Sequence, residues 1–310
     1  MRIVVALGGN ALLERGEKPD AAVQRRHVRR AAAALVPLAA EHELVVCHGN
    51  GPQVGLLALE SAADPALSRP YPLDVLDAQT QGMIGYWLVQ ELRNAGLRRS
   101  AIAVLTQTVV DAGDPAFATP TKFVGQLYDR AEAERLAAER DWRIAPDGAG
   151  WRRVVPSPRP RRIVERDTVA ALLDTGSLVV CGGGGGIPVV EAADGRLTGV
   201  EAVVDKDLTA ALLAIELHAD RLIILTDVTA VMRDFGTPRQ SPIGALGVDE
   251  LAGLGLPAGS MGPKLDACGI FTAATGNPSA IGAVDDAAAI LHGEAGTWIR
   301  PAPAPAGAGR

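Results

Sequence analysis

The stretch Ile3-Val4-Val5-Ala6-Leu7-Gly8-Gly9-Asn10 runs from apolar residues directly into a glycine loop. Short apolar runs bounded by glycine are typical of buried strands, so a first strand is predicted close to residue 1. A second run, Leu44-Val45-Val46-Cys47, enters His48-Gly49-Asn50-Gly51-Pro52 in the same way. Each loop is followed by a helical pattern, and the backbone N–H groups of two such loops can converge on an anion. The sequence therefore predicts a phosphate or carboxylate site here.

The rest of the chain repeats this alternation of strands and helices. Helices are expected over 21–41, with Pro37 kinking or interrupting the first, and over 75–94, closed by Gly96. Further strands are expected at 102–105, 178–181 and 221–225, the last two running into Gly182–Gly186 and Thr226-Asp227. Special residues at the carboxyl ends of strands are typical of a mainly parallel sheet with helices on both faces and a ligand along that edge.

Two segments depart from the alternation. Residues 112–162 are rich in Pro, Gly and Arg, and a structureless loop of that length is improbable, so a small protruding subdomain is predicted. The tail, 301–310, consists of Pro, Ala, Gly and one Arg, and is expected to be disordered and dispensable. A main domain of 1–300 follows.

Composition narrows the class of function. The chain has 310 residues and a formal charge of −6, which disfavours binding to nucleic acid or an anionic membrane. Its three cysteines show no CxxC spacing, so neither a disulfide framework nor a zinc site is indicated. We find no signal peptide pattern and no apolar run of spanning length, and we expect a cytoplasmic protein with small-molecule ligands.

Seven motifs together resemble carbamate kinase, a branch of the amino acid kinase superfamily, and occur in that family's order. They are LGGNAL (7–12), HGNGPQVG (48–55), TQGMIGYWL (80–88), GWRRVVPSPRP (150–160), GGGGIPVV (183–190), GVEAVVDKD (199–207) and SMGPK (260–264). The resemblance implies the amino acid kinase fold, an open αβα sandwich, and reversible phosphoryl transfer between ATP and carbamate to give carbamoyl phosphate. It also implies that the reaction is often used to make ATP, as in arginine breakdown.

The chemistry of such a reaction can be compared with the residues present. Carbamate already carries a nucleophilic oxyanion, so no general base is needed; two anions must be held in line while the spreading charge is neutralised. Lysines, Mg²⁺ brought with ATP or ADP, and backbone amides suffice for that task. Lysine is scarce in this chain, and only Lys18, Lys122, Lys206 and Lys264 occur. We assign no protein ligand to the metal.

Two of the lysines lie at predicted helix starts. Lys264 precedes a helical pattern over 265–274, where a cation is mildly disfavoured by the helix dipole and could simply be exposed. The family implies instead that it contacts the transferring phosphoryl group. Lys206 stands between Asp205 and Asp207. Taken alone, Asp207 is a typical N-cap; by resemblance it orients the lysines, and the two roles are compatible.

Lys122 tests the family's particular arrangement. Many amino acid kinases carry a lysine on the first strand, but Ala6 stands there in this chain. Carbamate kinases resemble this chain in placing the charge on the protruding subdomain, in Thr-Pro-Thr-Lys, and Lys122 fits. Without that resemblance, Lys122 would be interpreted as a solvated loop residue. The family commonly continues Pro-Ile-Gly, whereas Phe123 and Val124 follow here, so the loop loses a restriction on its backbone.

The resemblance assigns the remaining site residues to three groups. Backbone N–H groups of Gly8, Gly9 and Asn10 are expected at the phosphoryl groups; Gly49, Asn50, Gly51 and Gln53 at the carbamate end; and Gly184 and Gly185 beside them. Nucleotide contacts are expected at Thr226, Asp227 and Met261. His48 is interpreted as structural, because an anionic nucleophile needs no base. The glycine run lacks the G-x-G-x-x-G spacing and the following helix of a dinucleotide site.

Three functions stay open at this stage. Besides carbamate kinase, they are another small-acid kinase on the same fold and a catalytically silent nucleotide-binding sensor. Retention of Lys122, Lys206, Asp207 and Lys264 together argues against the sensor. The family also implies a homodimer, to which one apolar helix face is available, although core burial explains those residues equally well: Met83, Ile84, Tyr86, Trp87 and Leu88.

Overall fold

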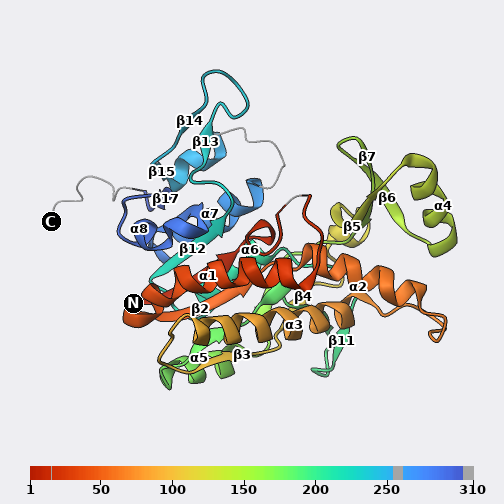
Figure 1. The fold of residues 1–310 in the computed structure, drawn as a ribbon, viewed down its shortest axis with the longest axis horizontal. Helices are drawn as coiled ribbons and strands as arrows, with labels where there is room; N and C mark the ends of the chain where they lie inside the picture. Colours follow the sequence, from red (N-terminus) through yellow and green to blue (C-terminus); the bar gives the residue numbers. More distant parts are fainter. Residues whose placement is uncertain (15, 254–260, 303–310) are drawn as a thin grey trace.

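The computed structural model describes residues 1–14, 16–253 and 261–302. Within them, the largest sheet has eight strands in the order β15-β17-β16-β12-β1-β2-β9-β3 (Figure 1). All neighbours in it are parallel except β16 and β17. The strands are β1 (Arg2–Leu7), β2 (Glu43–His48), β3 (Ala101–Ala103), β9 (Leu178–Val180), β12 (Arg221–Thr226), β15 (Ala245–Gly247), β16 (Ser279–Ala283) and β17 (Thr297–Arg300).

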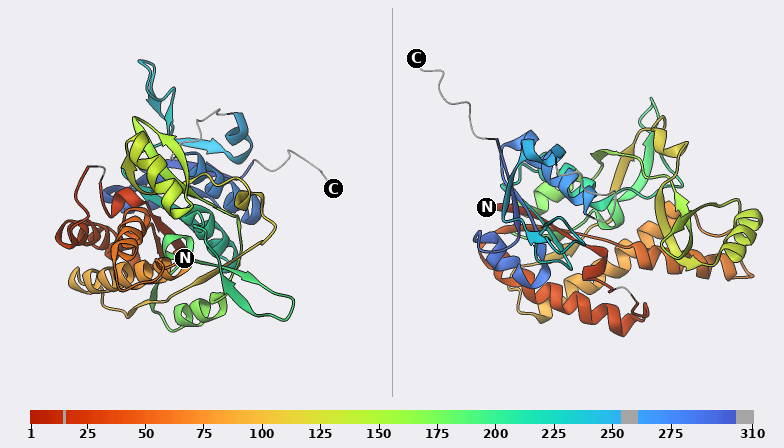
Figure 2. Two further views of the ribbon diagram at one scale, coloured as in Figure 1. Left: turned by 90° about the vertical axis from the view of Figure 1, so that its right-hand side faces the viewer. Right: turned by 90° about the horizontal axis from the view of Figure 1, so that it is seen from above.

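Alternate residues of the central strands enter two separate cores, as the period of a strand requires. In β1, Ile3, Val5 and Leu7 pack on one face with the helices α1 and α3, whereas Val4 and Ala6 pack on the other with α6 and α7. The helices are α1 (Ala21–Glu41), α2 (Gly51–Ala63), α3 (Leu73–Asn94), α4 (Arg130–Arg140), α5 (Arg166–Asp174), α6 (Lys206–Glu216), α7 (Gly262–Thr275) and α8 (Ala287–Leu291). The predicted αβα sandwich is thereby observed, with one layer of helices on each face (Figure 2).

Smaller sheets extend this body. A mixed sheet has the order β11-β10-β4-β8, from β4 (Gln107–Val110), β8 (Pro160–Ile163), β10 (Ile187–Glu191) and β11 (Leu197–Gly199). A hairpin pairs β13 (Met232–Arg233) with β14 (Ser241–Pro242). The third sheet, β5-β7-β6, comes from β5 (Lys122–Tyr128), β6 (Arg143–Asp147) and β7 (Gly150–Val155). With α4 it projects from one end of the molecule, alongside α2, and we call it the protruding sheet (Figures 1 and 2).

Individual helices and strands agree with the predictions to different degrees. Helix α1 continues through Pro37, because burial of Leu35 and Leu38 against the sheet offsets the hydrogen bond that proline cannot make. The helix ends one turn after Pro37. Gly96 follows α3 with φ +99°, the left-handed conformation expected after a helix. The strand expected at 102–105 is shorter, since β3 ends at Ala103. The end of the tail, 303–310, lies outside the described residues.

The apolar face of α3 is mostly core. Ile84, Trp87 and Leu88 are buried among residues of β1, β2 and α1, and Met83 packs against the same cluster. Tyr86 is the exception, because 56% of it is exposed. Core burial therefore accounts for most of the residues that were considered for a dimer face.

Candidate active site

The two glycine loops of the first strands touch each other. β1 ends at Leu7, and Gly8 donates its N–H to the Leu225 carbonyl at 2.7 Å before a 3₁₀ turn, Gly9–Ala11, begins. β2 ends at His48, and Gly49 donates its N–H to the Leu7 carbonyl at 3.0 Å. A Cβ atom at position 49 would lie 3.0 Å from the Cα and N atoms of Gly9, a distance that real side chains avoid. Glycine at position 49 therefore allows the close approach of the two loops, since a side chain would require Gly9 to move.

The glycine run after β9 closes one side of this region. Gly184 has φ +68°, and a Cβ there would collide with the side-chain amide of Asn50. The carbonyl of Gly185 accepts hydrogen bonds from the hydroxyls of Thr108 and Thr209, each at 2.8 Å. Since Thr209 belongs to α6, the run is fixed between the Asn50 loop and the start of that helix.

The side chain of Asn50 is hydrogen-bonded to two residues of α3. Its Nδ2 donates to Asp77 Oδ1 at 2.7 Å and to Thr80 Oγ1 at 2.9 Å. Asp77 is completely buried, its Oδ2 has no partner, and burial raises its pKa well above the usual range, with Asp74 and Glu201 adding to the rise. Burial therefore favours the protonated, neutral form of Asp77, and sequence reasoning did not single this residue out.

The amide of Gln53 turns into the protein. Its Nε2 donates to Gln24 Oε1 at 2.8 Å, while its Oε1 is buried without a partner. Gln53 lies in the first turn of α2, close to Asn50 in the chain. Its side chain therefore links the loop to α1.

Helix α6 begins with an aspartate cap that the sequence assigned to the wrong residue. Asp205 Oδ1 accepts from the N–H groups of Asp207 at 2.9 Å and Leu208 at 3.4 Å, so Asp205 is the N-cap. Asp207 lies inside the first turn, and its carboxylate is free to point elsewhere. The sequence analysis placed the cap at Asp207, two residues beyond Asp205, which caps the helix in the structure.

Asp207 holds two lysines at once. Its Oδ1 lies 2.8 Å from Lys206 Nζ and its Oδ2 lies 3.0 Å from Lys264 Nζ. The Lys264 side chain comes from the first turn of α7, where Pro263 follows Gly262, and it is only 9% exposed. Lys206 Cδ would lie 3.4 Å from a Cβ at position 49, so the lysine pair stands directly beside the glycine loops.

Lys122 reaches the same place from the protruding sheet. Its Nζ lies 2.6 Å from Asp205 Oδ2, the oxygen that does not cap α6. The side chain of Asp205 is 13% exposed and that of Lys122 is 36% exposed. Three ammonium groups and two carboxylates thus form one lysine–aspartate cluster with an excess of one positive charge: Lys122, Asp205, Lys206, Asp207 and Lys264.

The pKa shifts in the cluster show which charges are already balanced. Burial opposes ionisation of Asp207, but Lys206 and Lys264 outweigh it and lower its pKa. Burial also opposes the charge on Lys206, yet Asp207 and Asp205 raise its pKa. Lys264 has one carboxylate partner and a lysine neighbour, so burial and Lys206 lower its pKa. Lys264 is consequently the cation with the most to gain from an incoming anion.

The predicted nucleotide residues stand at the other side of Gly8. Thr226 ends β12, and its Oγ1 would lie 3.3 Å from a Cβ at position 8. The same hydroxyl donates to Asp227 Oδ1 at 3.0 Å, and Asp227 is exposed. Met261 lies at the N-cap position of α7 and packs against the core beneath that helix. The contacts place Thr226 at the glycine loops, while Met261 lies three residues before Lys264.

The imidazole of His48 is buried and poorly suited to acid–base chemistry. It is buried, its Nδ1 lies 3.0 Å from the Gly49 carbonyl oxygen, and burial lowers its pKa to about 4. A Cβ at Gly183 would strike its ring. His48 is therefore neutral at neutral pH and fills space beside Gly49 and Gly183, in agreement with its structural interpretation.

Comparisons with known proteins agree with one another. The amino acid kinase family model matches residues 1–281. Carbamate kinases of Rhizobium meliloti (strain 1021) and Haemophilus influenzae (strain Rd) are each 51% identical, over 96% of this chain and 93% and 96% of their own lengths. The structure of carbamate kinase from Giardia lamblia bound to AMP-PNP superposes with a TM-score of 0.89 at 40% identity, covering 97% of this chain and 98% of that one.

Proposed function

Since this chain belongs to the amino acid kinase family and, within it, to the carbamate kinases, we propose that it transfers a phosphoryl group reversibly between ATP and carbamate. The products are ADP and carbamoyl phosphate. The family, the fold and an ATP-dependent kinase activity predicted from the motifs are confirmed by the relatives described above. The observation that carries the assignment in this molecule is the Asp207 carboxylate, which holds Lys206 and Lys264 beside the two glycine loops.

The reaction requires little besides charge and alignment. The attacking carbamate oxygen is already an anion, so the barrier is the repulsion between two anions and the charge that spreads over the transferring group. Burial lowers the pKa of His48 to about 4, which makes it a weak base and agrees with a mechanism that uses none. Proton transfer to or from a side chain has no part in the proposed step.

The lysines neutralise the charge that develops. Lys264, whose positive charge is the least compensated, contacts the transferring phosphoryl group, and Lys206 contacts it from the side of the Gly49 loop. Asp207 fixes the two ammonium groups beside each other and balances part of their repulsion. Because these charges are in place before the substrates arrive, no reorganisation is required during transfer.

Lys122 adds a third charge in the position that a first-strand lysine takes elsewhere in the superfamily. Ala6 is completely buried between its neighbours in the sheet and contributes no charge. Lys122 rests on Asp205 and exchanges this partner for the phosphoryl oxygens when the substrates bind. The strand that carries it is paired along β7, so Phe123 and Val124 continue a strand where the family's more usual proline would stand.

The glycine loops hold the two substrates by backbone N–H groups other than those of Gly8 and Gly49, which already donate to the carbonyls of Leu225 and Leu7. In our proposal Gly8, Gly9 and Asn10 face the phosphates of the nucleotide, and Gly49, Asn50, Gly51 and Gln53 surround the carbamate. Gly184 and Gly185 bound that pocket. The close approach of Gly9 to Gly49 supports this division, because it brings both sets of N–H groups to one place.

The nucleotide lies beyond Gly8, with Thr226, Asp227 and Met261 as its contacts. Mg²⁺ would come with the nucleotide, held mainly by phosphate oxygens and water, and we assign it no protein ligand. When bound, the ion neutralises charge on the phosphates.

We further propose a cytoplasmic homodimer that handles small molecules only. The net charge of −6 disfavours partners such as nucleic acid. Within the described residues, no helix is both long and apolar enough to cross a membrane. Tyr86, exposed on α3, is the side chain of the earlier dimer set that is available for contact with a second copy.

The test is formation of ATP from Mg-ADP and carbamoyl phosphate, measured in a coupled assay. We expect turnover that disappears on complete chelation of divalent ions and returns with Mg²⁺. Acetyl phosphate, offered at the same concentration, serves as the control for another small-acid kinase. Faster turnover with acetyl phosphate, or transfer that survives chelation, would contradict the proposal.

A further inference from the structure

The segment between β11 and α6 is held at both ends by the protruding sheet. Arg153 Nη2 lies 2.8 Å from Glu201 Oε1, and Lys122 Nζ lies 2.6 Å from Asp205 Oδ2. Between these two ion pairs, Val203 donates its N–H to the Pro156 carbonyl at 3.0 Å. The three residues 202–204 are all buried. The ion pair that brings Lys122 to the lysine–aspartate cluster is therefore one of three contacts between the protruding sheet and residues 201–205.

The two cations share a face of the protruding sheet. In the antiparallel pair of β5 and β7, Lys122 is opposite Val155 and Val124 is opposite Arg153. Side chains two residues apart on a strand, and those directly opposite, point to the same side. Val124 and Val155 are buried against the body in one small core, so the face that carries Lys122 and Arg153 is the face that docks.

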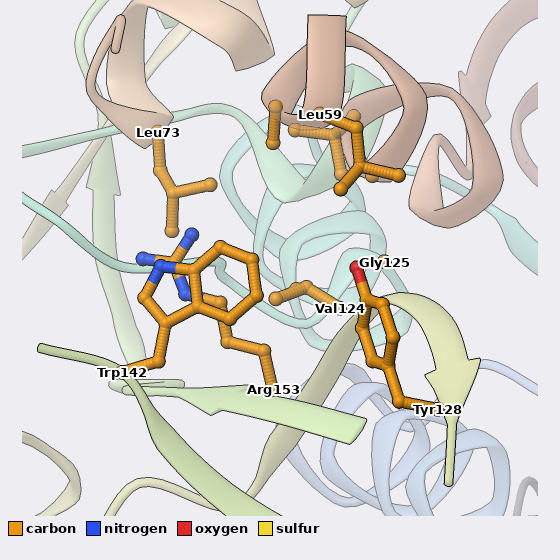
Figure 3. A pocket seen from close by; sticks show the side chains of 10 residues that line it. Leu59, Leu73, Val124, Gly125, Tyr128, Trp142 and Arg153 are labelled. Carbon is orange, nitrogen blue, oxygen red and sulfur yellow. The ribbon is translucent and has the colours of Figure 1, made fainter. Parts of the chain in front are cut away.

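Glu201 connects Arg153 to the rigid part of the molecule. Its Oε2 accepts the N–H of Leu73, the first residue of α3, at 2.8 Å. The guanidinium group of Arg153 also lies 5.0 Å from the centre of the Trp142 ring, and Figure 3 shows it reaching past that ring toward Leu73. The Arg153 side chain is 16% exposed. Arg153 is thus fixed from both the protruding sheet and the start of α3.

The pair contributes little to stability. Half of the Glu201 side chain is exposed, and ion pairs at such surfaces contribute little because water and salt screen them. Its effect is geometric: Arg153 lies on the strand that is paired with the strand of Lys122, so a shift of β7 moves β5 with it. An error of about 1 Å in the position of a group that stabilises a transition state can cost on the order of a hundredfold in rate.

We propose that Arg153, through Glu201, is a positioning residue that sets where Lys122 meets the transferring phosphoryl group. The proposal rests on the function assigned to Lys122 above. Arg153 does not touch the substrates. It fixes the protruding sheet on the start of α3, and the pairing of β7 with β5 carries this position to Lys122.

The chain offers a matched control. Arg152 is next to Arg153 on β7, points to the other face, and pairs with Asp147 of the same sheet at 2.9 Å. Arg152→Ala therefore removes an equal charge from the same strand without releasing Glu201. We expect Arg153→Ala to lower single-turnover transfer about tenfold to a hundredfold with ADP affinity unchanged, and Arg152→Ala to leave both near the parent values. Arg153→Lys, whose ammonium group can reach one Glu201 oxygen, restores part of the rate.

The decisive measurement combines the two positions. If Arg153 acts through Lys122, Arg153→Ala causes no further loss when it is added to Lys122→Met, and hydrogen exchange rises in 122–128 in Arg153→Ala but not in Arg152→Ala. Losses that multiply, or an Arg153→Ala variant as fast as the parent, overturn the positioning role while Lys122 keeps its own. If Lys122→Met itself transfers at the parent rate, the assigned function of Lys122 is wrong and the positioning role falls with it.

Discussion

Lys264→Met is the substitution with the most direct consequence for the chemistry. Methionine is close to lysine in shape, so the change removes the positive charge while the side chain still fills its place in the first turn of α7. The lysine–aspartate cluster falls from an excess of one positive charge to none. Asp207 keeps Lys206 at 2.8 Å, so no buried carboxylate is left without a partner. We therefore expect the variant to fold.

The size of the effect follows from the charge that is lost. A unit charge about 4 Å from the developing charge contributes about 4 kcal/mol at an effective dielectric constant of about 20. Part of this interaction is already made with the substrates in the ground state. About 2–4 kcal/mol is left for the transition state, which corresponds to a loss of about a hundredfold or more in turnover.

Single-turnover transfer from carbamoyl phosphate to Mg-ADP measures this loss without product release. His48→Gln is the control, because it changes a residue in contact with the Gly49 loop but removes no charge at neutral pH. Thermal unfolding of both variants shows whether they are folded. Equal losses in Lys264→Met and His48→Gln, in two folded proteins, would refute the reasoning.

The pH profile offers a second view of the same residue. Burial and Lys206 lower the pKa of Lys264, so the protonated form that the mechanism needs is lost at a lower pH than for a free lysine, whose pKa is about 10.4. We expect kcat/KM of the parent to decline on the alkaline side below that value, since kcat/KM reports the free enzyme. In Lys264→Met this decline is absent or displaced. An unchanged alkaline limb would contradict the assignment.

Three further predictions concern other parts of the site. Lys122→Met should depress turnover while leaving ADP affinity and thermal stability nearly intact, because a partly exposed lysine stabilises little; parent-like single-turnover rates would show that the protruding sheet has another role. Asp77→Asn should raise the Tm at neutral pH and progressively less toward pH 4. The reason is that the folded-state pKa of Asp77 is raised, so the parent protein loses stability as pH rises above the unfolded value of about 3.9. A gain in Tm that is equal at both pH values would disprove this. His48, with a folded pKa of about 4, adds stability that is complete above the unfolded value of about 6.5 and lost as pH falls toward 4, so chemical denaturation of His48→Gln should lack this acid-side loss.

The sequence determined the parts of the molecule that depend on neighbouring residues. Apolar runs that end in glycine loops predicted β1 and β2 and their common edge, and the structure brings Gly9 and Gly49 into contact there. The ordered motifs added the fold and the four charged residues Lys122, Lys206, Asp207 and Lys264, all of which lie in one cluster. Residue type and spacing suffice for the strands and loops because strand period and loop geometry are local, whereas the four charged residues were assigned through the resemblance to carbamate kinases.

Tertiary structure decided which of several possible partners each side chain has. The sequence favoured Asp207 as the cap, but the position at which α6 begins makes Asp205 the cap and leaves Asp207 to hold two lysines. Ile84 and its apolar neighbours on α3 became core because α1 and the sheet cover them. The contacts of Asp77 with Asn50 and of Arg153 with Glu201 join residues 27 and 48 positions apart. Such pairings depend on how the layers and the protruding sheet pack, and no local pattern encodes that packing.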